Sequence, residues 1–306
     1  QDGEFTLALS LDELTDIVDN KMRVVSFQVP DAAYDQLSEG NKRALSHLVR
    51  ATEILGTVFL RQDHPDNIRA KDAFERASAN SDLSTQMAYK LFRTFNGIEG
   101  VDMYAQKSRP LRIFADKELN PGKGFYPQDI SSDEMIEYVL AHPEQASAIF
   151  SNNTMVIRED GRLTAVPYSV FFRDEMEAAA RELLEAAKET DHEGLASYLR
   201  WQAQALVNDS DPEMVFNADK TWIGLEDSPL EFTIGRECYD DRFSSEIAND
   251  PRVKAMLETY GIKAKSKDTF GVRTGIVNQD SYAEISSYRQ HLDVFGGLMP
   301  MSEEYH

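Results

Sequence analysis

The segment from Arg173 to about Leu206 constrains the fold of this chain more strongly than any other. Alanine, leucine and glutamate dominate it, and these residues favour helix because they lose little side-chain freedom there. The pattern is interrupted between Thr190 and Gly194, which predicts two consecutive helices instead of one long one.

The rest of the chain predicts further helices and a few separate strands. Helical patterns occur at 32–60, with an interruption near Gly40, and at 67–95, 251–260 and 280–294. Ser131 with Glu134 forms a capping-box pattern that opens a helix ending before Pro143, and a second short helix follows through Ala146 and Ile149. Strand patterns occur at 22–29, 154–158, 163–167, 230–234 and 270–277, whereas the proline- and glycine-rich residues 100–129 predict a long loop. Because strands and helices do not alternate regularly, the predicted class is α+β, mostly helical with a small mixed or barrel-like β-sheet.

A length of 306 residues is enough for roughly two domains, each with its own core. We expect a mostly helical region at 1–125 and an α+β region with hairpins at 126–306. One continuous lobe is the alternative.

Net charge excludes several classes of partner. At -21 the chain offers no cationic surface for nucleic acid or for anionic membranes. No apolar run reaches about 18 residues, so no membrane-spanning helix is expected. A single cysteine cannot form an internal disulfide. The first residue is Gln1 instead of methionine, which fits a removed signal peptide or a trimmed chain; we expect a cytoplasmic location, with periplasmic or secreted as the alternative.

The stretch from Asp219 to Phe243 holds the strongest candidate site. Its residues 230–234 alternate apolar and polar, which predicts a half-buried strand between Ser228-Pro229 and Gly235. Just after that glycine come Glu237, Tyr239, Asp240 and Asp241. In an extended segment, residues two apart face the same side, so the Glu237 carboxylate could hold a substrate ammonium beside a Tyr239 hydroxyl that stabilises an oxyanion. An edge strand with a solvated acidic turn is the alternative.

Other motif-like patterns do not support a site. His192-Glu193 lacks the second histidine that a zinc helix needs one turn later, so we interpret His192 as a helix-start residue. The remaining histidines form no ligand pair, and no metal site is visible. Arg181 to Glu185 matches the centre of a Nudix box, but Arg173 and Ala186 replace the required glutamates, so a solvated helix face explains it better. Cys238 has no neighbouring histidine and is expected to be a packed small residue.

The candidate stretch resembles the dipeptidyl peptidase III family of zinc metallopeptidases. The resemblance rests on Ser228-Pro-Leu-Glu-Phe-Thr-Ile-Gly235 followed by Glu237-Cys-Tyr-Asp-Asp-Arg-Phe243. Weaker similarity at 125–127, 154–168 and 275–278 extends it over most of residues 100–295. The single residue Arg236 between Gly235 and Glu237 departs from some members, and residues 244–269 look inserted or replaced. The HExxGH zinc motif and its third glutamate are absent.

The resemblance implies that this chain is the N-terminal portion of such an enzyme, similar to its lower lobe. It implies that Tyr239 stabilises the tetrahedral intermediate and that Glu237 binds the free N-terminus of a peptide, with Asp240 as a further substrate-binding residue. Zinc belongs to the complete family enzyme, and none is expected to bind this chain alone.

Three functional hypotheses follow. The chain is the peptide-binding portion of a zinc-dependent exopeptidase that releases dipeptides, inactive without a zinc-bearing segment or chain as partner. The alternatives are a non-catalytic peptide-binding or interaction protein, and a helical protein with no peptide role.

Overall fold

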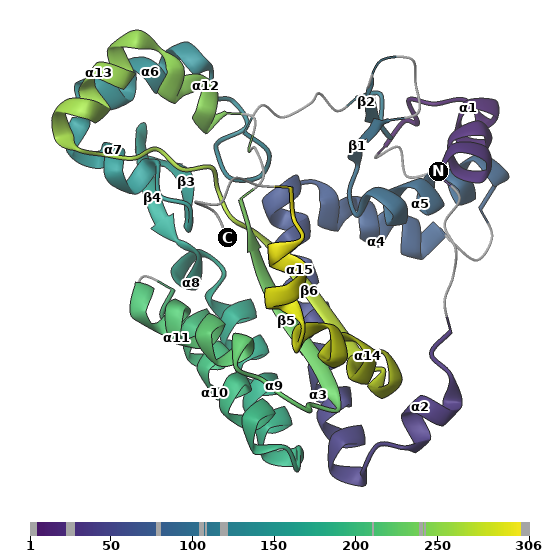
Figure 1. Cartoon of the computed structure of the whole chain (residues 1–306). Helices are drawn as coiled ribbons and strands as arrows, with labels where there is room; N and C mark the ends of the chain where they lie inside the picture. The colour runs from purple at the N-terminus through teal and green to yellow at the C-terminus, as the bar shows by residue number, and fades with distance from the viewer. Residues whose placement is uncertain are drawn as a thin grey trace.

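The computed structural model describes residues 5–22, 28–77, 81–103, 107, 109–116, 122–209, 211–238, 241 and 243–300. The predicted strand at 22–29 falls largely on residues 23–27, outside this described part. The chain folds as predicted into an α+β arrangement with helices in the majority (Figure 1). Its described strands form three separate two-stranded antiparallel sheets.

A stack of helices forms the centre of the molecule. The longest helix, α3 (Glu39–Asp63), packs along α9 (Arg173–Glu189), and α9 packs in turn on α10 (Glu193–Val207). The next helix, α11 (Pro212–Ile223), packs on α10. The break between α9 and α10 lies where it was predicted. α11 was not predicted, and Ala218 is its one buried residue.

The N-terminal part gathers around a smaller core at one end of α3 (Figure 1). Its elements are α1 (Leu11–Thr15), η1 (Asp16–Lys21), α4 (Asn67–Ala77), α5 (Leu83–Phe95), β1 (Glu99–Asp102) and β2 (Arg109–Arg112). The short helix α2 (Asp31–Asp35) has no buried residue and lies by the opposite end of α3, where Lys42 lies over the Tyr34 ring (Figure 1). Asn96 ends α5 in the left-handed conformation with φ 53°, as the predicted helix end requires. The β1–β2 pair corrects the prediction that residues 100–129 form only a loop, since Glu99 to Asp102 pair with Arg109 to Arg112.

The predicted hairpin is confirmed as β3 (Thr154–Glu159) and β4 (Arg162–Pro167). Its turn residues Asp160 and Gly161 both have positive φ, 48° and 75°, which is the geometry that an Asp-Gly hairpin turn favours. Three helices surround it, namely α6 (Ser132–Ala141), α7 (Pro143–Ile149) and α8 (Tyr168–Phe171).

The capping box at the start of α6 forms only in part. Ser131 Oγ accepts from the Glu134 amide at 3.1 Å. The Glu134 carboxylate, however, binds Arg158 on β3 at 2.6 and 3.1 Å. The glutamate is therefore used to join α6 to the hairpin.

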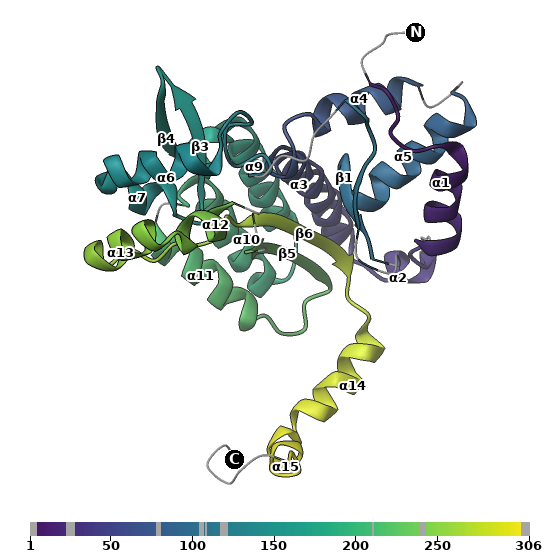
Figure 2. The same ribbon diagram turned by 90° about the horizontal axis from the view of Figure 1, so that it is seen from above.

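The third sheet crosses the helical stack. It pairs β5 (Leu230–Glu237) with β6 (Thr269–Ile276), and β6 lies against α3. Between these strands come α12 (Ser244–Asn249) and α13 (Pro251–Tyr260), and Gly261 ends α13 with φ 65°. After β6, α14 (Gln279–Arg289) and α15 (Leu292–Gly297) contain no buried residue and project away from the rest (Figure 2). The predicted final helix at 280–294 is thus two helices, broken at Gln290 and His291.

Two apolar clusters hold the fold together, and α3 contributes to both. Leu48 and Leu55 belong to the larger cluster, which extends from Leu37 to Phe270, and Leu60 belongs to the smaller N-terminal cluster. The predicted division at residue 125 stays a prediction.

The segment around Phe125 is tied into the larger cluster. The Gly124 amide donates to Gln62 O at 2.9 Å, and Phe125 O accepts from Val156 of β3 at 2.8 Å. A Cβ on Gly124 would lie 1.9 Å from Arg61 O, so only glycine allows this close approach to α3.

None of the helices in the described part of the chain has an apolar stretch long enough to span a bilayer.

Candidate functional site

The candidate site is built on β5, whose alternation matches the prediction. Leu230, Phe232 and Ile234 are buried, while Glu231 and Thr233 are partly exposed. The strand continues through Gly235 to Glu237, which corrects the prediction that Gly235 ends it. Glu237 therefore occupies a fixed strand position instead of a loop.

The partly exposed face of β5 and β6 has a floor without side chains beneath Glu237. Gly235 lies directly opposite Gly271 in the strand register. A Cβ on Gly235 would lie 2.9 Å from Glu237 Oε1, and one on Gly271 would lie 3.1 Å from the same atom. The Glu237 side chain thus lies flat over the two glycines, in space that a side chain at position 235 or 271 would fill.

An arginine on the neighbouring strand pairs with this carboxylate. Arg273 of β6 donates from Nη2 to Glu237 Oε1 at 3.0 Å. The arginine side chain is 67% exposed and the glutamate 28% exposed, so water screens the pair on one side. An ammonium that binds Glu237 has to share the carboxylate with Arg273 or displace it.

Two of the predicted site residues, Tyr239 and Asp240, lie outside the described residues. The structure describes Glu237, Cys238 and Asp241 around them. Cys238 is exposed, which corrects the prediction that it is a packed small residue.

Asp241 was expected in an exposed acidic turn, but it is 1% exposed. Its Oδ1 accepts from the amides of Phe243 at 3.0 Å and Ser244 at 2.7 Å, and its Oδ2 accepts from the Lys267 amide at 3.0 Å. The carboxylate therefore caps the start of α12 and joins it to the segment before β6.

Lys267 is fully buried beneath this junction. Its Nζ donates to Ile149 O at 2.7 Å, Ser151 O at 2.8 Å and Thr154 Oγ1 at 2.9 Å. Burial lowers the pKa of Lys267 to about 7, against the opposing effect of the nearby Asp241 and Asp268 charges. We call Asp241, Lys267 and Asp268 the buried layer.

The buried layer continues through Asp268 to the hairpin. Asp268 Oδ2 accepts from Asn152 Nδ2 at 2.6 Å, and its carbonyl accepts from the Tyr168 hydroxyl at 2.9 Å. Burial raises the pKa of Asp268. The layer thus fixes β6 and the end of β5 to α7, β3 and α8. Sequence reasoning missed it because no local pattern distinguishes a buried lysine from an exposed one.

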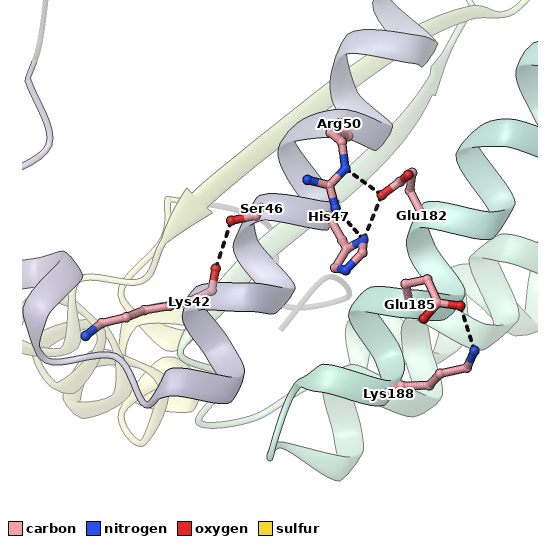
Figure 3. Close-up of polar contacts among 7 residues, drawn as sticks. All are labelled: Lys42, Ser46, His47, Arg50, Glu182, Glu185 and Lys188. Atoms are coloured by element: carbon pink, nitrogen blue, oxygen red, sulfur yellow. Dashed lines mark hydrogen bonds and ion pairs between the residues drawn. The ribbon is translucent and has the colours of Figure 1, made fainter.

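The Nudix-like pattern lies on α9 and serves helix packing, as Figure 3 shows. Glu182 Oε2 lies 2.7 Å from His47 Nδ1 and 2.9 Å from Arg50 Nε, both on α3. Partial burial raises the pKa of Glu182, but the hydrogen bonds from His47 and Arg50 outweigh it and hold the pKa below its usual value. Glu185 binds Lys188 one turn later at 2.6 Å. These carboxylates already have basic partners.

His192 is the N-cap of α10, as predicted, and its Nδ1 accepts from the Leu195 amide at 3.0 Å. Within the described part of the chain, no three His, Cys, Asp or Glu side chains lie close enough together to hold a metal ion.

Comparison with known proteins supports the fold. No family model matches the sequence. The chain is 22% identical over 321 residues to Nudix hydrolase 3 of Arabidopsis thaliana, an alignment that covers 90% of this chain and 38% of that protein.

Two solved structures have a similar fold. Dipeptidyl peptidase III from Caldithrix abyssi matches with a TM-score of 0.69 and 24% identity, over 90% of this chain and 46% of that one. Dipeptidyl peptidase III from Corallococcus sp. strain EGB matches with a TM-score of 0.69 and 20% identity, over 97% of this chain and 49% of that one.

The chain therefore has the fold of part of dipeptidyl peptidase III, and it spans less than half the length of each of these three proteins. The resemblance inferred from the sequence is confirmed at the level of the fold. That this part is the N-terminal portion stays a prediction.

Proposed function

We propose that this chain is the peptide-binding portion of a dipeptidyl-peptidase-III-like exopeptidase, which releases dipeptides from peptide N-termini. The fold similarity over 90% and 97% of the chain supports the choice of family. Since a fold does not determine an activity, the site residues have to support the function.

The position of Glu237 carries this proposal. Its carboxylate lies at the end of a buried strand, over the glycine floor of Gly235 and Gly271, on the face that is open to solvent. A carboxylate fixed in this way can accept charge-assisted hydrogen bonds from the α-ammonium of a peptide. Capture of that ammonium would set the register of the peptide along the strand.

Tyr239 and Asp240 take the other two roles that the family resemblance implies. The Tyr239 hydroxyl would donate a hydrogen bond to the oxyanion that develops at the scissile carbonyl. Asp240 would add a second carboxylate beside the peptide N-terminus. Both roles rest on their positions in the sequence after Glu237.

Zinc is the metal of the family to which the fold is similar, and the described residues offer no ligand set that fits it. We therefore assign no zinc ligand to them and derive no catalytic step through the metal. A partner segment or chain would have to provide it.

Binding of a free peptide N-terminus tests the proposal. A five-residue peptide with a fluorophore at its C-terminus should bind, and its N-acetylated twin should bind at least about tenfold more weakly, because a charge-assisted hydrogen bond contributes about 1.5–3 kcal/mol. Glu237→Ala should abolish this difference. Glu226→Ala, which removes an exposed acid before β5, is the matched control and should preserve it.

Arg273→Ala sharpens the test, because it removes the cation that competes for Glu237. Affinity for the free-amine peptide should rise in this variant, while affinity for the acetylated peptide stays constant. Equal binding of both peptides to the unmodified chain would overturn the proposal. Release of dipeptides from a chromogenic substrate by this chain with added zinc would overturn the assignment of zinc to a partner.

A further inference from the structure

A cavity lies between α10, α11 and the outer edge of β5, with a volume of about 330 Å³. Its walls include Tyr198, Gln202, Asp219, Trp222, Thr233 and Arg236. Ligand cavities in proteins span roughly 300–1,000 Å³, so this one suits a small molecule and not a long peptide. Neither the fold similarity nor the peptide site accounts for it.

Arg236 brings a guanidinium with unused donors to this cavity. Its Nη2 donates to Ala205 O at 3.3 Å, and its Cζ lies 5.7 Å from the centre of the Phe270 ring. Within the described part of the chain, no carboxylate lies within salt-bridge distance of it. A guanidinium presents several N–H groups in a fixed fork that matches a carboxylate, and most of this fork has no protein acceptor.

Asp219 provides the opposite charge on α11. It is exposed, and the structure gives it no hydrogen bond or ion pair among the described residues. The neighbouring acid Glu231 is already used, because its Oε1 accepts from Trp222 Nε1 at 3.0 Å and from the Thr233 hydroxyl. Asp219 is therefore the carboxylate of this cavity that can accept a new ammonium group.

We propose that this cavity binds a small zwitterion, either a free amino acid or a dipeptide. Its carboxylate would bind the Arg236 fork, its ammonium would bind Asp219, and its side chain would lie against Trp222 and Tyr198. Asp219 and Arg236 attract each other electrostatically without a direct ion pair in the described part of the chain, and Asp209 and Asp268 also act on Arg236. A ligand that carries both charges can form a direct contact with each of the two residues. Glu237 does not line this cavity, although Gly235 beneath it does, and the proposal does not depend on the peptidase function.

Calorimetric titration with four probes tests this site, namely L-leucine, glycyl-L-leucine, N-acetyl-L-leucine and L-leucinamide. At least one of the first two should bind, and each blocked probe, which lacks one charge, should bind at least about tenfold more weakly. Binding of L-leucine alone identifies an amino-acid site, and binding of glycyl-L-leucine alone identifies a dipeptide site.

Variants then assign the contacts. Asp219→Asn, a change on an exposed helix position, should reduce affinity at least about tenfold, whereas Glu213→Gln on the same helix should leave it unchanged. Arg236→Lys keeps the charge but removes the fork, and should weaken binding of both free probes. Glu237→Ala should have no effect, which separates this site from the peptide site. Absence of saturable binding, or affinity unaltered by Asp219→Asn, would overturn the proposal.

Discussion

Two groups of charged residues hold this fold together in different surroundings. The α3–α9 cluster, formed by His47, Arg50 and Glu182, lies at the edge of two packed helices, where water reaches its side chains. The buried layer of Asp241, Lys267 and Asp268 lies beneath the end of β5, where Lys267 is 0% and Asp241 1% exposed. Charge interactions are screened at the first site, whereas unpaired groups at the second would be costly.

A match to a known sequence motif therefore does not indicate which charged residues stabilise this structure. The α3–α9 cluster contains Glu182 of the Nudix-like pattern, yet this carboxylate pairs with His47 and Arg50 across two helices. The buried layer matches no motif, but it fixes both strands of the candidate site. We therefore expect substitutions in the layer to have the larger effects.

Lys267→Met should have the largest effect. The variant keeps the apolar stem but leaves Ile149 O, Ser151 O and Thr154 Oγ1 without their shared donor. Since each buried polar group without a partner costs about 1–3 kcal/mol, the free energy of unfolding should fall by about 3 kcal/mol at pH 7.5. Urea unfolding followed by circular dichroism measures it, with Lys254→Met on the exposed face of α13 as a control within about 0.5 kcal/mol of wild type.

Asp241→Ala should follow, with a loss of about 2 kcal/mol. It removes the cap of α12 and leaves the Lys267 amide without its acceptor. Asp241→Asn is the matched variant, because its one side-chain oxygen can still accept from Phe243 and Ser244, and it should lose less. A loss as large in the asparagine variant as in the alanine variant would show that the charge and the contact with the Lys267 amide, and not the cap, stabilise the junction.

The pH dependence of stability should reveal Lys267 directly. Burial lowers its pKa from 10.5 to about 7, so between these values the unfolded chain binds a proton that the folded chain lacks. The free energy of unfolding should therefore rise with pH across this window and lose that contribution as the pH falls towards 7. Wild type should gain about 1 kcal/mol more than Lys267→Met between pH 8 and pH 9. Parallel curves for the two proteins would contradict the burial of this lysine.

The same contrast explains which parts of the fold the sequence could predict. α9 and α10 were predicted because alanine, leucine and glutamate favour helix within the segment itself, and the β3–β4 turn because Asp160 and Gly161 specify it locally. α11 and the β1–β2 pair were missed. In α11 only Ala218 is buried. The β1–β2 pair depends on pairing between segments within a proline- and glycine-rich stretch.

The candidate site was predictable only in part. Glu237 could be singled out because it follows an alternating strand, but its pairing with Arg273 depends on a strand register that no sequence pattern gives. Likewise, the alternative prediction placed Asp241 in a solvated turn, and nothing in the sequence singled out Lys267, because charged residues are mostly exposed. Lys267 is buried because it contacts residues more than a hundred positions away in the chain, such as Ile149.

Glu182→Ala should have the smallest effect and completes the comparison. It removes a carboxylate that two basic residues share, His47 at 2.7 Å and Arg50 at 2.9 Å, but all three side chains reach solvent. Partly exposed ion pairs usually contribute about 0.2–1 kcal/mol, so the loss should stay below about 1 kcal/mol and shrink in high salt. Glu185→Ala, which removes only the pair with Lys188 on the same helix, should lose still less. If Glu182→Ala destabilised the protein as much as Lys267→Met, exposure would not distinguish the two clusters, and the α3–α9 contact would have to depend on these charges instead of on its apolar packing.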